Sequence, residues 1–212
     1  MYLPQHFAET RLEELHRIIR EHPLGMLVAH TASGLDANHL PFELDPARGA
    51  CGTLQGHIAR ANPLATEVAD GAEVLVVFRG VQGYISPNWY PSKHETHRHV
   101  PTWNYEVVHA QGRIRLIDDV KFVAALVARL TRIHEAAEPR PWQMADAPRE
   151  YIEQMLDRVV GLEVEVTSLS GKRKLSQNRE ARDAEGVVRA LRERGQEDLA
   201  SAVARANHLR EE

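Results

Sequence analysis

Cysteine and aromatic residues are scarce in this sequence, which has one cysteine among its 212 residues and an aromatic content of 6%. A single cysteine, Cys51, cannot form an intrachain disulfide, and this excludes a small domain stabilised by disulfides. Gly49 and Gly52 lie close to it and predict a turn. No neighbouring base would activate the thiol, so we expect an inert side chain.

Long apolar runs and an excess of positive charge are also missing. No stretch approaches the roughly 20 apolar residues that cross a bilayer, so we expect no membrane span. Residues 1–7 lack the basic and apolar parts of a signal peptide, and we therefore expect a cytoplasmic protein. Lys and Arg number 26 against 30 Asp and Glu, a net charge of −4. Because DNA binding depends on a basic surface, DNA is a weakly supported partner.

The remaining composition is that of a folded globular chain. Hydrophobic residues make up 43% and charged residues 26%, and the length suits one core with helical additions. Apolar periodicity predicts strands at 24–30, 35–44, 52–58, 73–78, from 84, at 103–117 and at 162–166. Helices are predicted at 9–21, from Asn62 to about 69, at 118–135 and at 151–159, and the tail from 183 is helix-prone.

Most of these strands follow one another in hairpins. Ser33-Gly34 predicts a turn between the first two strands, and residues 80–83 predict a turn of a second hairpin. A parallel sheet would instead alternate strands with long helices. The sequence therefore predicts a mainly β fold with peripheral helices, an α+β antiparallel barrel. Gly112, inside a predicted strand, indicates a bulge or a close backbone approach.

Three histidines stand close together at His94, His97 and His99, in a segment, 87–100, that is predicted to be a long exposed loop. A zincin helix requires two histidines four residues apart, and Arg98 occupies that second position. We therefore interpret the segment as a solvated loop and expect no metal. Phosphate-binding P-loops, dinucleotide fingerprints and nucleophile elbows are absent from the sequence.

Polar residues beside the predicted strands are the remaining candidates for a site. Asn38 and His39 precede Pro41, which indicates either an edge strand or a strand that hydrogen-bonds a flat ligand. In residues 56–63, a strand leads into a helix start that carries Arg60 and Asn62. This pattern suits an anion site, but a capped helix with a solvated arginine is the commoner explanation of the same spacing.

Aromatic side chains gather near the histidine segment, at Trp89-Tyr90 and at Trp103-Asn104-Tyr105. They suit either a core or the slot of a ring that needs stacking and hydrogen bonds. The run Lys172-Arg173-Lys174 would pair with phosphate oxygens or remain solvated.

Taken in order, several segments resemble the PaiB-type FMN-binding negative transcriptional regulators, relatives of the pyridoxamine-phosphate-oxidase-like split barrels. The matching segments are 1–7, 22–25, 36–42, 56–63, 84–90, 100–105 and 171–178. The resemblance implies a six-stranded antiparallel split β-barrel over residues 1–180, with residues 181–212 as a helical extension of the same domain. It also implies a homodimer with FMN at the interface.

The resemblance further implies the residues that hold FMN. The phosphate would be bound by His57, Arg60 and Asn62, and the ring would lie along Asn38, His39 and Leu40. A second copy would supply Trp103, Asn104 and Tyr105, and the site would be closed by Lys172, Lys174 and Gln177. Relatives that act on pyridoxamine phosphate use arginines near the C-terminus, and this tail does not match them.

Three functions follow from the resemblance. The first is a negative transcriptional regulator that acts on DNA directly or through a metabolite or partner, although no helix-turn-helix is evident in the sequence. The second is a flavin-dependent oxidoreductase with segment 87–100 as its lid. The third is a haem protein with an axial ligand among His94, His97 and His99.

Overall fold

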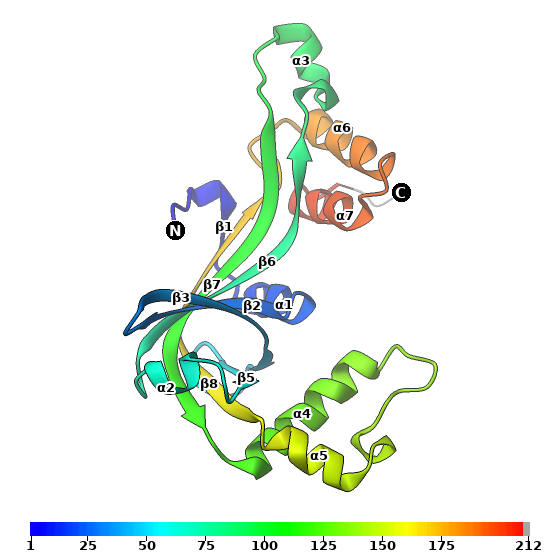
Figure 1. Ribbon diagram of the computed structural model, residues 1–212. Helices are drawn as coiled ribbons and strands as arrows, with labels where there is room; N and C mark the ends of the chain where they lie inside the picture. The colour runs from blue at the N-terminus through cyan, green and yellow to red at the C-terminus, as the bar shows by residue number, and fades with distance from the viewer. Residues whose placement is uncertain (210–212) are drawn as a thin grey trace. The chain divides into compact units, whose positions relative to one another are not determined.

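The computed structural model describes residues 1–209 and contains strands, α-helices and three short 3-10 helices (Figure 1). The strands are β1 Ala8–Glu9, β2 Leu24–Thr31, β3 Gly34–Pro41, β4 Glu43–Asp45, β5 Thr53–Ala59, β6 Glu73–Ile85, β7 Thr102–Ile117 and β8 Val159–Lys174. The helices are α1 Leu12–Glu21, α2 Leu64–Glu67, α3 Pro91–Thr96, α4 Val120–Glu135, α5 Arg149–Leu156, α6 Ala181–Arg192 and α7 Glu197–Ala206. The 3-10 helices are η1 Gln5–Phe7, η2 Pro87–Trp89 and η3 Met144–Asp146.

The strands form an eight-stranded sheet in the order β3-β2-β6-β7-β8-β5-β4, and β1 pairs with β8. The pairs β1–β8, β2–β3, β2–β6, β4–β5 and β5–β8 are antiparallel. Two strands more than the expected six are present. The short strands β1 and β4, of two and three residues, account for this difference.

The chain divides into two compact units, and β6, β7 and β8 contribute residues to both. Unit 1 consists of residues 1–21, 79–108 and 170–212, and unit 2 of residues 22–78 and 109–169. This division does not follow the expected boundary at residue 180, so a 1–180 domain with an extension stays a prediction. Within residues 1–209, no helix is both long and apolar enough to cross a membrane.

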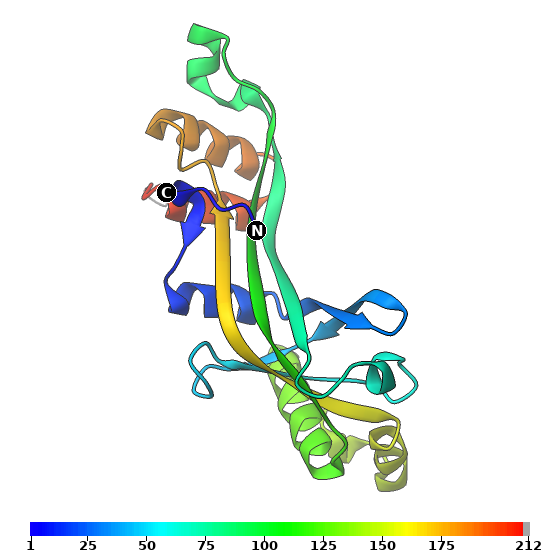
Figure 2. The same ribbon diagram turned by 90° about the vertical axis from the view of Figure 1, so that its left-hand side faces the viewer.

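Unit 2 contains the predicted hairpin of β2 and β3, drawn in blue in Figure 2. Gly25 allows this hairpin to pack closely, because a Cβ atom there would lie 2.8 Å from side-chain atoms of Val76 and Phe78. Gly112 confirms the predicted close backbone approach, since its Cβ would lie 2.4 Å from the carbonyl oxygen of Glu165. Glycine is used at both positions because no side chain fits.

Helix α4 of unit 2 begins where Asp119 caps it, as its sequence predicts. The Asp119 carboxylate accepts hydrogen bonds from the backbone amides of Lys121 and Phe122. Leu126 and Leu130 of α4 are buried, whereas Ile133 is 55% exposed. The following helix, α5, ends at Leu156, three residues before β8 begins, so the predicted helix at 151–159 was too long at its C-terminal end.

Unit 1 has its own core, in which α6 and α7 pack together. Figure 1 shows these two helices side by side, in orange and red. The core is built from buried aliphatic side chains and one aromatic: Ile85, Tyr90, Leu175, Val187, Val188, Leu191, Leu199, Ala200, Ala202, Val203 and Ala204. The tail is therefore helical, as predicted, up to Ala206, and residues 210–212 of the predicted extension lie outside the described residues.

The predicted turn at 80–83 is wrong, because β6 runs without interruption from Glu73 to Ile85. The glycines in this strand do not break it. A Cβ atom at Gly83 would lie 2.6 Å from Leu199 Cδ2 of α7, so glycine here makes room for a helix. The second predicted hairpin is thereby replaced by one long strand.

The predicted loop at 87–100 is also wrong in part, because it contains η2 and α3. Pro87 and Pro91 occupy the first turns of these two helices. Proline is tolerated there because the first turn of a helix does not use the backbone N–H that proline lacks. At the N-terminus, the helix expected from residue 9 begins instead at Leu12, because Ala8 and Glu9 pair with β8.

Buried charges hold the N-terminal segment of unit 1 to β8. The Arg173 guanidinium, 7% exposed, lies 2.7 Å from Glu106 Oε1, 3.2 Å from Glu14 Oε1 and 3.5 Å from Glu9 Oε2. Arg11 also donates its backbone amide and two guanidinium hydrogens to Glu9. Burial by itself would raise the pKa of Glu9, but these hydrogen bonds from Arg11 and the charges of Arg11 and Arg173 lower it to about 2.

Replacing Glu9 with Gln should flatten the acid side of the stability profile. The pKa of Glu9 is lower in the folded chain than its ordinary value of 4.5, so its contribution is complete above pH 4.5 and is lost as the pH falls towards 2. This contribution is at most about 3 kcal/mol. Urea unfolding measured from pH 7 to pH 3 checks the prediction. Glu13→Gln, at an exposed position of the same segment, should keep the wild-type slope, and equal slopes for all three proteins would contradict it.

Candidate functional site

The predicted site residues fall into two sets, one in each unit. The first set lies in unit 2: Asn38, His39 and Leu40 on β3, His57 on β5, and Arg60 and Asn62 directly after β5. The second set lies in unit 1: Trp103, Asn104 and Tyr105 on β7, Lys172 and Lys174 on β8, and Gln177 just beyond it.

A hollow of about 640 Å³ opens beside Asn38 and Asn62. The Asn62 amide nitrogen donates to Asn38 Oδ1 at 2.7 Å, although the two residues are 24 positions apart. The structure thus brings together one residue predicted for the ring and one predicted for the phosphate. The hollow is lined by Thr31, Ser33, Leu35, Asp36, Asn38, Ala59, Ala61, Asn62, Pro63 and Glu67.

The two amides are oriented by hydrogen bonds at both ends. Asn62 Oδ1 accepts from the backbone amide of Leu64 at 2.9 Å, as a helix cap does. Asn38 Nδ2 donates to Asp36 Oδ2 at 2.7 Å. A backbone N–H can only donate and a carboxylate oxygen accepts, so this chain of bonds fixes which atom of each amide is oxygen. The hollow therefore presents amides whose orientation is set by the chain itself.

The other members of the β3 group face in different directions. Leu40 is buried in the core, and His39, on the opposite face of the strand, is exposed. Asp36 was missed by the sequence reasoning, although it lies two residues before Asn38 and therefore on the same face of an extended strand. Period-two spacing would have identified it.

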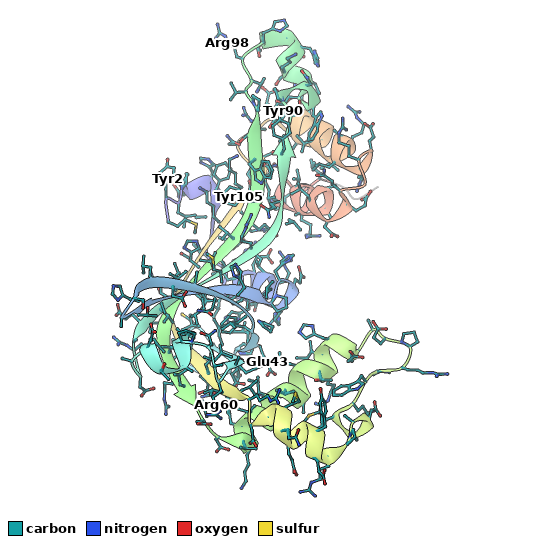
Figure 3. All side chains as sticks on the ribbon, viewed as in Figure 1. Tyr2, Glu43, Arg60, Tyr90, Arg98 and Tyr105 are labelled. Carbon is teal, nitrogen blue, oxygen red and sulfur yellow. The ribbon has the colours of Figure 1, made fainter. Side chains whose placement is uncertain are left out.

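Arg60 does not line the hollow. Its guanidinium forms a two-pronged pair with Asp118 at 2.6 and 2.7 Å and also donates to the backbone carbonyls of Asp157 and Val159. Figure 3 labels the position of Arg60. Asp118 raises the pKa of Arg60 by this hydrogen bond. Helix α2 is four residues long and offers no substantial dipole to an anion. Arg60 thus ties the end of β5 to the segment before β8.

His57 is half-buried on β5. Burial lowers the pKa of its imidazole. Within residues 1–209, its Nδ1 atom is buried and has no hydrogen-bond partner. A buried polar atom without a partner is costly, so His57 is a candidate to contact a bound group.

The second set is held together by its two lysines. Lys174 Nζ donates to the carbonyl oxygen of Trp103 at 2.6 Å and to the Thr102 hydroxyl. Lys172 Nζ donates to the carbonyl of Tyr2 at 3.1 Å and lies 5.5 Å from the ring centres of both Tyr2 and Tyr105 (Figure 3). Burial lowers the pKa of Lys174, with smaller effects from nearby cations.

Two members of this set are committed to the protein's own structure. Asn104, 1% exposed, donates to the Ser176 hydroxyl at 2.9 Å. Gln177 uses its amide on the backbone, accepting from Leu175 and donating to the Arg173 carbonyl. Trp103 differs, because 49% of it is exposed. Its ring meets Tyr84 edge-on at 6.5 Å, a partner that only the pairing of β6 with β7 reveals.

The histidine segment shows no metal centre. His94 lies in α3, and His97 has a left-handed backbone at the end of this helix. Both ring nitrogens of His99 are hydrogen-bonded, to the Ser92 hydroxyl at 2.8 Å and to Arg179 at 3.2 Å. In the described part of the chain, no group of three or more His, Cys, Asp or Glu residues could hold a metal ion. His99 therefore helps to fix α3 and has no nitrogen to spare for haem.

The chain's family follows from comparison with known proteins. Residues 1–168 match the family model described as "Putative FMN-binding domain". The chain belongs to this FMN-binding family, and its cofactor is FMN.

Relatives in sequence cover nearly the whole chain. An uncharacterized protein of Aspergillus fumigatus is 35% identical, with 93% of each chain covered. The "Protease synthase and sporulation protein PAI 2" of Bacillus subtilis is 29% identical over 90% of this chain and 89% of its own length. The expected resemblance to PaiB-type proteins is thereby confirmed.

Solved structures share the fold. The flavocytochrome Anf3 from Azotobacter vinelandii superimposes with a TM-score of 0.59 at 13% identity, covering 81% of this chain and 72% of its own. The FAD and haem binding protein from Mycobacterium smegmatis gives 0.53 at 19% identity, with 79% and 73% covered. The expected fold class, a mainly antiparallel split barrel with peripheral helices, is confirmed.

Residues of the first set fit part of a flavin. The hollow beside Asn38 has the volume of a ligand site, and its oriented amides match the donors and acceptors at the edge of an isoalloxazine ring. His57, whose buried Nδ1 atom lacks a partner among the described residues, does not line the hollow. Asp36 and Glu67 line the hollow without a lysine or arginine, so it suits the uncharged ring better than the phosphate. Flavin supplies the redox chemistry when bound, and the chain supplies position.

Replacing Asp36 with Ala should weaken FMN binding about threefold to tenfold. The change removes the acceptor that orients the Asn38 amide while leaving that amide in place, and a lost hydrogen bond of this kind is worth about 1 kcal/mol. Fluorescence titration with FMN measures the effect. Asp70→Ala, an exposed acid of the same unit outside the hollow, should bind like wild type. Unchanged affinity in Asp36→Ala would remove the hollow from the flavin site.

Proposed function

We propose that this chain is an FMN-dependent negative regulator of gene expression that works as a homodimer in the cytoplasm. The observation that carries the proposal is the similarity, over 90% of the chain, to a Bacillus subtilis protein named for protease synthesis and sporulation. Membership of the FMN-binding family adds the cofactor. Regulation by a flavin protein can respond to the amount or the redox state of the flavin.

Exposed aromatic side chains of unit 1 support the homodimer. Tyr2 is 84% exposed, Tyr84 47% and Trp103 49%. Aromatic residues are enriched in protein interfaces, and exposed apolar patches commonly mark them. A second copy would cover these rings. That copy would also contribute its second set of site residues and so complete the flavin site. Trp103 and Tyr105 would then contact the ring, and Lys172 and Lys174 would add positive charge.

Regulation without direct DNA contact fits the C-terminal helices best. Helices α6 and α7 are joined by a four-residue turn with Gly195 at a φ of +68°, a connection like that of a helix-turn-helix. However, α7 begins with Glu197 and Asp198, where a DNA-reading helix contacts bases and phosphates. Because these carboxylates repel the DNA backbone, we propose that the protein acts through a metabolite or a protein partner.

Arg60 tests the proposed position of the phosphate. Arg60→Ala should weaken FMN binding about 10- to 100-fold, because a charge-assisted hydrogen bond contributes about 1.5–3 kcal/mol. Riboflavin, which lacks the phosphate, should bind equally well to the variant and to wild type. Titration of both flavins gives the two affinities.

Asp118→Asn is the matched control for Arg60. It removes the competing carboxylate and leaves the guanidinium in place, so FMN should bind at least as tightly as to wild type. Equal loss of FMN and riboflavin in Arg60→Ala, or weaker FMN binding in Asp118→Asn, would show that the pair serves the structure alone.

Promoter DNA distinguishes the proposed function from its alternatives. The FMN-loaded protein should give no salt-sensitive gel shift with promoter DNA beyond that with random DNA of equal length. A specific shift would contradict indirect action. Steady oxidation of NAD(P)H by the same preparation would instead favour the flavin-dependent oxidoreductase.

A further inference from the structure

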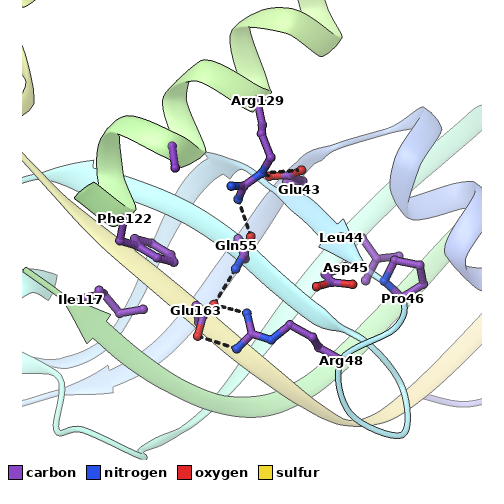
Figure 4. Close-up of a pocket in the computed structure, with 11 residues that line it drawn as sticks. Glu43, Leu44, Asp45, Pro46, Arg48, Gln55, Ile117, Phe122, Arg129 and Glu163 are labelled. Carbon is purple, nitrogen blue, oxygen red and sulfur yellow. Dashed lines mark hydrogen bonds and ion pairs between the residues drawn. The ribbon is translucent and has the colours of Figure 1, made fainter. Parts of the chain in front are cut away.

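A second cavity lies in unit 2, between α4 and the strands β4, β5 and β8 (Figure 4). Its volume is about 730 Å³, and it shares no lining residue with the hollow beside Asn38. The cavity is lined by Glu43, Leu44, Asp45, Pro46, Arg48, Gln55, Ile117, Phe122, Ala125, Arg129 and Glu163. None of these residues belongs to the predicted flavin site.

A row of polar side chains crosses the floor of the cavity because of strand register. Gln55 on β5 pairs with Glu43 on β4 and with Glu163 on β8, so the three side chains lie on one face of three neighbouring strands. Gln55 Nε2 donates to Glu163 Oε1 at 2.5 Å, and Gln55 Oε1 accepts from Arg129 at 2.7 Å. Gln55 and Glu163 are each 8% exposed. The floor is thus fixed before any ligand arrives.

Two ion pairs at the ends of this row neutralise four of the five charged residues that line the cavity. Arg129 Nε donates to Glu43 Oε2 at 2.8 Å, and Arg48 pairs with Glu163 through both of its terminal nitrogens. The hydrogen bond from Arg48 lowers the pKa of Glu163 and keeps this carboxylate ionised. Within each pair, the positive charge of the arginine and the negative charge of the glutamate cancel.

Asp45 is the fifth charged residue and gives the cavity an excess of one negative charge. Its Oδ1 atom accepts from the backbone amide of Ala47 at 3.0 Å. The charge of Asp45 also contributes to raising the pKa of Arg48, so these two groups lie within electrostatic range of each other. The five lining charges sum to −1, so the cavity favours a ligand with one positive charge over an anion.

The remaining wall of the cavity is apolar. Leu44, Pro46, Ile117, Phe122 and Ala125 contribute aliphatic surface and one aromatic ring. Ligand sites combine such walls with a few placed polar groups. The apolar wall suits a ring system, and Phe122 can contact the ring in an edge-on or offset geometry.

We propose that this cavity is a binding site for a small aromatic amine with one positive charge, whose ammonium group pairs with Asp45 and whose ring packs against Phe122. The site is separate from the flavin and gives a regulator a place to sense a metabolite. The proposal depends on the cavity alone and stands or falls independently of FMN binding.

Three indole compounds of similar shape test the charge preference: tryptamine, tryptophol and indole-3-acetate. Isothermal titration of the FMN-loaded protein should show tryptamine binding at least tenfold more tightly than the alcohol or the acid, a difference of about 1.4 kcal/mol. Only the amine brings a charge opposite to that of Asp45. Equal affinities for the three compounds, or no tryptamine binding, would overturn the proposal.

Two variants locate the site. Asp45→Asn keeps the oxygen that caps Ala47 and should reduce tryptamine affinity to that of tryptophol, while Asp70→Asn, an exposed acid outside the cavity, should change nothing. Ala125→Leu should fill the ring's place and abolish binding. Methyl NMR should show shifts at Leu44 and Ile117 on adding tryptamine. Wild-type affinity in Asp45→Asn, or competition by FMN for the bound amine, would overturn the assignment.

Discussion

The register of β5 between β4 and β8 is the constraint on which both cavities depend. β5 pairs with β8 from Thr53 to Ala59, and with β4 over its first three residues. Leu54 and Ile58 therefore enter the core, while Gln55, His57 and Ala59 share the opposite face. Gln55 reaches the cavity under α4, Ala59 lines the hollow beside Asn38, and His57 lies between them. A shift of one residue would exchange these faces and abolish both cavities.

Local signals in the sequence predicted the elements whose causes are local. The turn at Ser33-Gly34 predicted the β2–β3 hairpin, and the helix predicted from residue 118 begins at Val120, directly after its cap Asp119. The interruption of β6 was predicted wrongly because Gly83 has a distant cause, the approach of Leu199 from α7. The residues around a glycine do not show whether it forms a turn or a close contact, because both favour a residue without a side chain.

The candidate site likewise contains contacts that the sequence predicted and contacts that it could not predict. Family resemblance placed Asn38 and Asn62 together, and a hydrogen bond joins them. It could not reveal that Arg60 faces Asp118, because these residues are 58 positions apart and meet only once β8 lies between β5 and β7 in the sheet. Asn104 and Gln177 show a related limit. Their amides look suited to a ligand in the sequence, yet in the folded chain they satisfy Ser176 and the local backbone.

The pairing of Arg60 with Asp118 also decides which anions can approach this arginine. An anion that takes the same two guanidinium nitrogens must displace a carboxylate already aligned at 2.6 and 2.7 Å. Inorganic phosphate or sulfate brings no other contact to offset that exchange, whereas a larger ligand brings its whole surface. The Asp118 carboxylate therefore competes with inorganic anions for Arg60 and weakens their binding to it.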